Sequence, residues 1–597
     1  MKGLKFNMLK FFMLAIISSA TVPVAAQGQE NGALYAQTSA VHNLMVQLRA
    51  DEGSLGRFYY MRNSPEYTAR FQKLYKDYEQ QLGKLHFESM NTGSRVDYLL
   101  VKRDLENNQR LLEETAKEYS QISKWIPFAD KVYALEKPRR RGLNINGQQT
   151  ASELNSIEKS LIASKAALGK EISLDRNLAF RLQGAIKDLQ EALKSINTFY
   201  NLYDTDYTWW AAEPYKRVDA LLTSYADLAE AKGKVPAKNQ KIDQSGIVGS
   251  PIGRDELIQQ LQYEMIPYTP EELIEIANKE FAWCDKEMLK ASREMGFGDD
   301  WHQALEKVKN TYVPVGEQPE AMLALYDQSV DFLKKKDLIT IPPMAEETWR
   351  MQMMTPERQL INPFFLGGET FIISYPTSTM AHEDKLMSMR GNNPHFSRAT
   401  VHHELIAGHH LQGFMNNRHK EYRNFRTPFW TEGWSLYWEM LLWDQGFPRS
   451  AEDRVGMLFW RMHRCARIIF SLNYHLGKWT PQESIDFLVD RVGHERANAE
   501  GEVRRSFEGR YSPLYQVAYM IGGLQFYALN KELVGSGKMT NKMFHDAIMH
   551  ENSLPVEMIR AILQDKKLPI DYRTSWRFYT TDAATPKKTK RRQALND

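Results

Sequence analysis

Long stretches of the chain place apolar residues at helical spacing. The segment 96–124 carries apolar side chains three, four and seven positions apart among Lys, Arg and Glu, and the segment 151–201 repeats this spacing in two successive parts. Such spacing puts the apolar groups on one face of a helix, and that face must be buried against other helices. The pattern therefore predicts a helical bundle in the N-terminal half, which we interpret as a scaffold.

Two local signals divide this helical pattern. Proline and glycine interrupt the period between residues 235 and 253, and a helix restarts at Asp255. Further along, Thr269 can cap a helix, Pro270 suits its first position, and the acidic residues that follow favour the positive helix end. The sequence thus predicts an N-terminal helical region, 27–253, and a second region, 254–585.

A single segment has the composition of a strand. Residues 369–376 are mainly β-branched and aromatic, follow Gly367 and Gly368, and end at Pro376. As an edge strand, this segment could pair with an extended peptide. The overall prediction is a mainly α fold, a large helical body with a deep cleft and a short β element near the chemistry described below.

Composition excludes several classes of protein. The 597 residues are 43% hydrophobic and 25% charged, the balance of a soluble globular protein. A formal net charge of +3 argues against nucleic acid as the main partner. The only cysteines are Cys284 and Cys465, so the chain has neither a disulfide framework nor a cysteine-rich zinc module.

The two ends of the chain have their own compositions. Residues 1–26 combine basic residues, the apolar run 11–17 and small residues before Gln27, which is the layout of a secretory signal peptide and is short for a membrane span. No cysteine follows the small residues, so we expect no lipid anchor. The mature protein should be periplasmic or secreted, without stable membrane association. Residues 586–597 form a basic tail that we expect to be solvated.

Four of the 15 histidines fall within residues 400–412. Neutral imidazole is a good zinc ligand, and a glutamate beside a ligand histidine can polarise a water bound to the metal. The common helical form of such a site is H-E-x-x-H. Here His403 and Glu404 are followed by four residues before His409. The spacing is therefore too long for two ligands one helical turn apart.

Helix geometry limits which histidines can share an ion. In a regular helix, His403 and His409 would lie about 120° apart, and His403 and His410 would share a face but lie about 10.5 Å apart along the axis. The helix must therefore bulge or break, and Gly408 is where this costs least. A glycine directly before the second ligand favours His409, with His410 as the alternative.

A second helix offers a carboxylate. Residues 429–439 read as a helix with Glu432 and Glu439 on one face. A carboxylate from this helix completes a two-histidine, one-glutamate site and leaves a fourth position for water. We therefore predict zinc bound by His403, Glu432 and either His409 or His410, with Glu404 as the catalytic base.

These motifs resemble those of the DUF885 family of bacterial proteins, which is assigned by similarity to zinc metallopeptidases. The family pattern is H-E-x-x-P-G-H-H-x-Q followed by E-G-W-x-x-Y-x-E; here it spans 403–412 and 432–439, with Ala407 in place of the usual proline. The resemblance covers most of the mature chain, most clearly from Arg254 onward. It implies a large, mainly helical body with a buried zinc-type site.

The resemblance also draws attention to residues outside the two motifs. Related helical metallopeptidases use a distant tyrosine or histidine to hold the oxyanion, which makes Tyr519 a candidate catalytic residue, with simple packing as the alternative; His545 is a weaker candidate. Arg504 and Arg505 could bind a substrate carboxylate or form surface ion pairs.

The function that these features predict is a secreted or periplasmic zinc-dependent hydrolase of short peptides, in which Glu404 activates a water bound to the metal. One alternative is a metal-dependent hydrolase of non-peptide amides or esters, which a substrate panel would distinguish. Another is a non-catalytic protein that binds metal or peptide; the presence of Glu404, which metal binding alone does not require, argues against it. The sequence does not indicate an oligomeric state.

Overall fold

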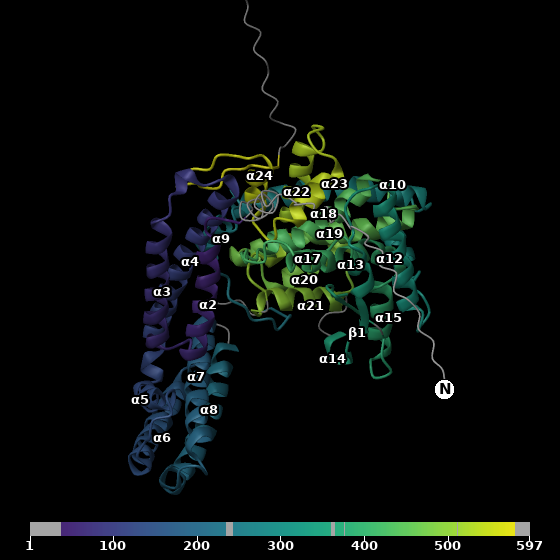
Figure 1. Ribbon diagram of the computed structural model, residues 1–597. Helices are drawn as coiled ribbons and strands as arrows, with labels where there is room; N and C mark the ends of the chain where they lie inside the picture. The colour runs from purple at the N-terminus through teal and green to yellow at the C-terminus, as the bar shows by residue number, and fades with distance from the viewer. Residues whose placement is uncertain (1–37, 235–242, 360–364, 375, 510, 580–597) are drawn as a thin grey trace, which may run out of the picture.

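The computed structural model describes residues 38–234, 243–359, 365–374, 376–509 and 511–579. These residues form a mainly helical body (Figure 1), as the sequence predicts, and the one sheet among them has two strands. None of the described helices is long and apolar enough to cross a bilayer. The predicted signal peptide, 1–26, and basic tail, 586–597, lie outside the described residues.

The N-terminal region consists of long helices. They are α2 (His42–Phe58), α3 (Pro65–Gly83), α4 (Thr92–Ile122), α5 (Ala129–Arg139), α6 (Gly147–Lys170), α7 (Arg176–Tyr200) and α8 (Thr205–Lys234), with short 3-10 helices at Phe87–Ser89 and Ser123–Trp125. The two segments with helical spacing correspond to α4 and to the pair α6 and α7. The side chain of Asp175 caps the start of α7, which explains why the second segment divides in two.

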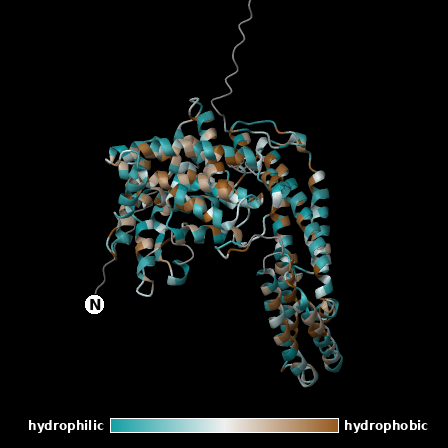
Figure 2. Cartoon of the chain, turned by 180° about the vertical axis from the view of Figure 1, so that it is seen from behind, coloured by the Kyte–Doolittle hydropathy of each residue, from teal (hydrophilic) through white to brown (hydrophobic). Residues whose placement is uncertain are grey.

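The hydrophobic core of this region is divided. Helices α5 to α8 bury a core of their own and form the elongated arm at the lower left of Figure 1. Seen from behind, the arm carries both hydrophobic and hydrophilic residues along its helices (Figure 2). Helices α2, α3 and the first half of α4 instead belong to the larger core that continues to Phe578. The predicted boundary at residue 253 marks a break in helical period, but the cores do not divide there.

The larger body contains the remaining elements. They are α9 (Gly253–Tyr263), α10 (Pro270–Glu294), α11 (Trp301–Lys309), α12 (Gln318–Lys335), α13 (Pro343–Thr348), β1 (Arg350–Met353), α14 (Pro356–Gln359), β2 (Thr370–Ile373), α15 (His382–Gly391), α16 (Pro394–Glu404), α17 (His409–Asn416), α18 (Pro428–Asp444), α19 (Ala451–His475), α20 (Pro481–Val492), α21 (Arg496–Phe507), α22 (Tyr515–Leu533), α23 (Asn541–Met549) and α24 (Val556–Leu563). The predicted start of α10 is confirmed: Thr269 caps it and exchanges hydrogen bonds with Glu272.

The predicted strand is confirmed as β2, which pairs in parallel with β1. On its other edge, the backbone N–H and C=O of Ile372 bond to Leu366 in an isolated antiparallel bridge. This edge is therefore occupied at Ile372, and the expectation that the strand pairs with an extended peptide does not hold there.

Helices α18 and α22 cross at very short range. A Cβ built on Gly433 of α18 would lie 2.5 Å from the Cα of Gly522 on α22, a separation that real Cβ atoms do not adopt. Glycine at both positions lets the two backbones touch. This contact brings the beginning of α22 beside Glu432, which is the part of α18 that carries the predicted carboxylate.

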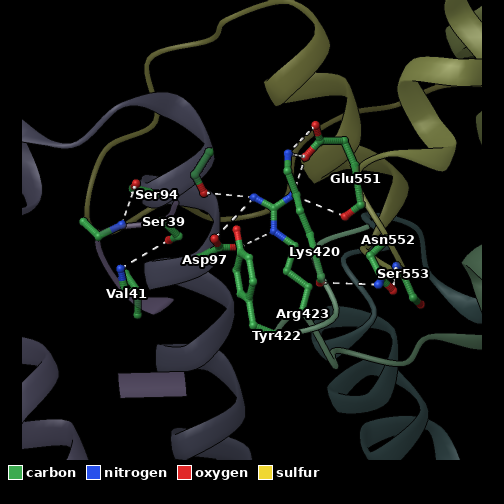
Figure 3. A network of polar contacts seen from close by, with 12 residues as sticks. Ser39, Val41, Ser94, Asp97, Lys420, Tyr422, Arg423, Glu551, Asn552 and Ser553 are labelled. Carbon is green, nitrogen blue, oxygen red and sulfur yellow. Dashed lines mark hydrogen bonds and ion pairs between the residues drawn. The ribbon is translucent and has the colours of Figure 1, made fainter. Parts of the chain in front are cut away.

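A buried polar network fastens α4 to the larger body (Figure 3). The enclosed guanidinium of Arg423 donates to Asp97 of α4 at 2.7 Å and also to Glu551, which follows α23. Lys420 donates to the same Glu551 carboxylate at 2.6 Å. The network therefore ties together three segments that lie far apart in the sequence.

We expect Arg423→Ala to lower the free energy of unfolding by about 3–5 kcal/mol, because it leaves the fully buried Asp97 carboxylate without its main charge partner. Arg426→Ala is the matched control, since Arg426 lies in the same loop but is exposed, and its effect should stay within about 0.5 kcal/mol. Urea unfolding of the three proteins measures both values. Similar small losses in the two variants would contradict the assigned role of the network.

Candidate metal centre

The helix that carries the histidines breaks where the sequence predicts. Helix α16 ends at Glu404 and α17 begins at His409. Gly408 packs so closely that a Cβ built on it would lie 1.8 Å from the carbonyl oxygen of His403. Glycine is needed here because the chain folds back onto the preceding turn, and this fold brings the two sides of the break together.

Two imidazoles and one carboxylate converge across this break. Glu432 Oε2 lies 3.5 Å from His403 Nε2 and 3.3 Å from His409 Nε2. Nitrogen and oxygen ligands held tetrahedrally at 2.0–2.2 Å from a zinc ion lie about 3.3–3.6 Å from one another. Glu432 Oε2 is also buried without a hydrogen-bond partner among the described residues. Both observations fit a set of donors arranged around a cation.

The other ring nitrogen of each imidazole is held by hydrogen bonding. His403 Nδ1 lies 2.7 Å from Glu439 Oε1, and His409 Nδ1 lies 3.0 Å from Gln412 Oε1. These oxygens accept from Nδ1–H, so each imidazole turns the lone pair of Nε2 towards Glu432. Glu439, which the sequence placed on the same helix face as Glu432, thus holds the His403 imidazole through Nδ1.

His410 does not join this site. Its Nε2 donates to the backbone carbonyl oxygen of Ala345 at 2.7 Å, and its ring points towards α13. The alternative assignment of His410 as a metal ligand is therefore wrong in this structure. The irregular backbone at 405–408 turns His409 towards Glu432, and the next residue necessarily leaves in another direction.

Glu404 faces the two histidines. Its carboxylate and the nitrogens of His403 and His409 lie within 4.8 Å of one another. Burial raises the pKa of Glu404, and the two nearby histidines oppose this shift without cancelling it. Gly367 packs against the carboxylate, where a Cβ would lie 2.2 Å from Oε2. The absence of a side chain at Gly367 thus gives Glu404 its place in the site.

The electrostatics of the cluster favour positive charge. Burial alone would raise the pKa of Glu432, but His409 and His403 beside it lower this pKa well below its usual range. Burial would likewise lower the pKa of His409, and the Glu432 carboxylate outweighs it, raising the pKa to about 9. The same carboxylate field that attracts a proton to these imidazoles attracts a dication.

The cluster opens into a cavity of about 360 Å³. Tyr519 lines it, with its ring nearly parallel to that of His403 and 6.2 Å away. Tyr515, one turn earlier on α22, donates from its hydroxyl to Glu432 Oε1 at 2.5 Å. Sequence reasoning did not single out Tyr515; its position four residues before Tyr519, on the same helix face, was the available signal.

Of the remaining candidate residues Arg504, Arg505 and His545, Arg505 alone lines the cavity. Arg504 pairs with Glu508 at 2.8 Å. His545 is fully buried between the Tyr437 hydroxyl and the carbonyl oxygen of Leu338 and does not line the cavity, so it has a structural role.

We expect Gly408→Ala to weaken metal binding by at least the 10–100-fold seen when supporting contacts of a metal site are lost, because the added methyl group would displace the His403 backbone. Gly413→Ala is the control: this glycine lies in α17 and a Cβ there meets nothing within 4 Å. Zinc titration of both variants tests the prediction. Equal affinity in both would mean that the backbone at 408 adapts without disturbing the ligands.

Comparison with solved structures shows the same fold in two other proteins. One is described as a putative lipoprotein of unknown function from Shewanella oneidensis, with a TM-score of 0.61, 15% identity, and coverage of 88% of this chain and 100% of that one. The other is described as a putative lipoprotein from Colwellia psychrerythraea, with a TM-score of 0.56, 15% identity, and coverage of 88% and 98%. No curated protein matches.

The family comparison agrees with the motifs. The model of the family described as "Bacterial protein of unknown function (DUF885)" matches residues 54–563, which include all of the residues that form the candidate metal centre. Because this match covers most of the sequence, the chain belongs to the DUF885 family.

Proposed function

We propose that this protein is a zinc-dependent hydrolase of short peptides. The observation that supports it most is the position of Glu432 Oε2, buried without a hydrogen bond and 3.3–3.5 Å from the Nε2 atoms of two histidines. The Glu404 carboxylate lies within 4.8 Å of a ring nitrogen of each of the same two histidines. Three candidate ligands beside a partly buried carboxylate with a raised pKa form an arrangement suited to the hydrolysis of an amide.

In this proposal, three residues bind the metal and Glu404 transfers the proton. His403, His409 and Glu432 would hold the metal. A bound zinc supplies Lewis acidity towards the carbonyl oxygen of the substrate. Glu404 takes a proton from the attacking water as its oxygen bonds to the carbonyl carbon, and then gives this proton to the leaving nitrogen as the C–N bond breaks.

Tyr519 is our candidate for stabilising the developing oxyanion. It lines the cavity beside His403, and burial raises the pKa of its hydroxyl, so this group stays protonated and can donate a hydrogen bond. Tyr515 supports the site differently, since its hydroxyl is already bonded to the ligand Glu432.

The size of the cavity supports short substrates. A volume of about 360 Å³ lies at the small end of the range for small-molecule sites, which favours a short substrate. The layout of residues 1–26 and the description of two structural relatives as putative lipoproteins support action outside the cytoplasm, in the periplasm or as a secreted protein.

A digest of a peptide library, with and without a chelator, tests the proposal on protein whose metal content has been measured. We expect cleavage that the chelator abolishes and that added zinc restores. Simple esters and non-peptide amides belong in the same panel. Cleavage of these alone would favour the other hydrolase class, and a metal-loaded protein that cleaves nothing would favour a binding protein.

A further inference from the structure

Two buried arginines of α19 line the cavity without full hydrogen bonding. Arg464 is 5% exposed and Arg467 is 3% exposed. Arg464 Nη2 donates to Glu439 at 3.4 Å, and Arg467 Nε donates to Glu502 at 2.7 Å. Within the described part of the chain, Arg464 Nε and Arg467 Nη1 have no hydrogen-bond partner. A buried donor without a partner lowers the stability of the fold, so a bound ligand that supplies an acceptor would be favourable here.

The two arginines lie close to the candidate metal ligands. Their guanidinium carbons are 4.7 and 4.4 Å from the ring centre of Tyr519, and the Tyr519 ring is 6.2 Å from that of His403. An extended chain spans at most 3.3–3.6 Å per residue. A group bound by the arginines would therefore lie within a few residues of a peptide bond held at the metal site.

The cavity lining itself carries more arginines than glutamates, and Glu439 and Glu502 behind it pair with Arg464, Arg467 and Arg505. The charged lining consists of four arginines and two glutamates beside the two histidines: Arg358, Arg464, Arg467, Arg505, Glu404 and Glu432. A bound dication would make this surface more positive. The planar guanidinium matches the two oxygens of a carboxylate, so a carboxylate is the anion that suits both the charge and the free donors.

We propose that Arg464 and Arg467 bind the C-terminal carboxylate of the substrate, so that the protein removes residues from the C-terminal end of short peptides. The hydrolytic part of this statement rests on the proposed function, whereas carboxylate binding does not. Every short peptide carries a terminal carboxylate near its last peptide bonds, whereas an acidic side chain would satisfy the arginines only at one position of the sequence. After hydrolysis, the fragment held by the arginines leaves as the amine product.

Equilibrium binding separates this proposal from the question of turnover. The protein carries Glu404→Gln to prevent cleavage, and calorimetry measures binding of acetyl-Ala-Ala-Ala as the free acid and as the C-terminal amide. We expect the acid to bind about 10–100-fold more tightly, the usual value of hydrogen bonds to a charged group. Adding Arg467→Gln should remove most of this preference. We choose Arg467 because Arg464 also contacts Glu439, which orients His403.

Arg461→Gln is the matched control. Arg461 lies on the same helix and pairs with Glu280 outside the cavity lining, so its loss removes the same charge and should leave the preference intact. Acetyl-Ala-Glu-Ala amide tests the other source of a carboxylate and should bind as weakly as the alanine amide. Thermal unfolding checks that each variant folds. Arg467→Lys keeps the charge but not the two parallel donors of the guanidinium, so we expect it to prefer the acid over the amide less strongly. If Arg467→Gln does not fold, Arg467→Lys provides the test.

Equal binding of acid and amide would overturn the proposal, as would a preference that survives every folded Arg467 variant. Tight binding of the glutamate-containing amide would overturn the assignment to the C-terminus. If the acid is preferred and Arg467 carries the preference, but no peptide is ever cleaved, the carboxylate site stands and the proposed hydrolytic function fails.

Discussion

Glu404→Gln is expected to slow peptide hydrolysis by roughly 10²–10⁴-fold, the usual contribution of a general base, while the metal stays bound. Glutamine keeps the shape of the side chain in the space left by Gly367 but cannot take a proton from water. The three ligands that we assign, on α16, α17 and α18, are unchanged by this substitution. Zinc content and initial rates measured on one preparation test the prediction.

The control for this variant is an exposed glutamate outside the cavity. Glu383 of α15 is such a residue, and Glu383→Gln should cleave at the wild-type rate. If Glu404→Gln kept its zinc and cleaved as fast as Glu383→Gln, another group would have to be the base. Loss of zinc from Glu404→Gln would instead place this carboxylate among the ligands.

His409→Ala is expected to reduce zinc affinity by more than the 10–100-fold typical of a supporting residue, because it removes a ligand. His410→Ala should leave zinc affinity nearly unchanged, since its imidazole Nε2 bonds to the Ala345 carbonyl oxygen instead of lying beside Glu432. The two variants control for each other: they are adjacent and remove the same group. Competition with a fluorescent zinc chelator gives both affinities. A greater loss in His410→Ala would refute the ligand assignment.

The contrast between these two histidines shows where sequence reasoning ends. A regular helix cannot bring His403 and His409 together, so the need for a break near Gly408 followed from geometry alone. The direction in which each side chain leaves an irregular segment follows from tertiary contacts instead, here the Ala345 carbonyl and the Glu432 carboxylate. Periodicity describes faces of regular helices and carries no information about residues 405–408.

Helix positions and caps were predictable because they depend on neighbours along the chain. The capping contacts of Thr269 and the spacing that defines α4 are examples. The core to which a helix belongs is not local: the first half of α4 joins the larger body through partners such as Arg423, hundreds of residues away. The break rich in proline and glycine before α9 therefore did not mark the division between the two cores.

The sequence gives little indication that Arg464 and Arg467 line the cavity. Arg464 and Arg467 lie in α19, a helix buried on nearly all sides. Because arginine is rarely buried without a partner, a charged residue in such a helix indicates a partner or a ligand nearby. The partners that hold them, Glu439 and Glu502, are 25 and 35 residues away. Only the packing of α19 against α16 and α22 reveals that these arginines share a cavity with His403.

Elemental analysis of the purified protein, beside His403→Ala and Glu432→Ala, tests whether these residues hold a zinc ion. Glu432 is the ligand that we assign on α18, and its Oε2 is the atom on which the two imidazoles converge. We expect about one zinc ion per wild-type chain, from three protein ligands on one ion, and an empty site in each variant. Full zinc occupancy in both variants would contradict it.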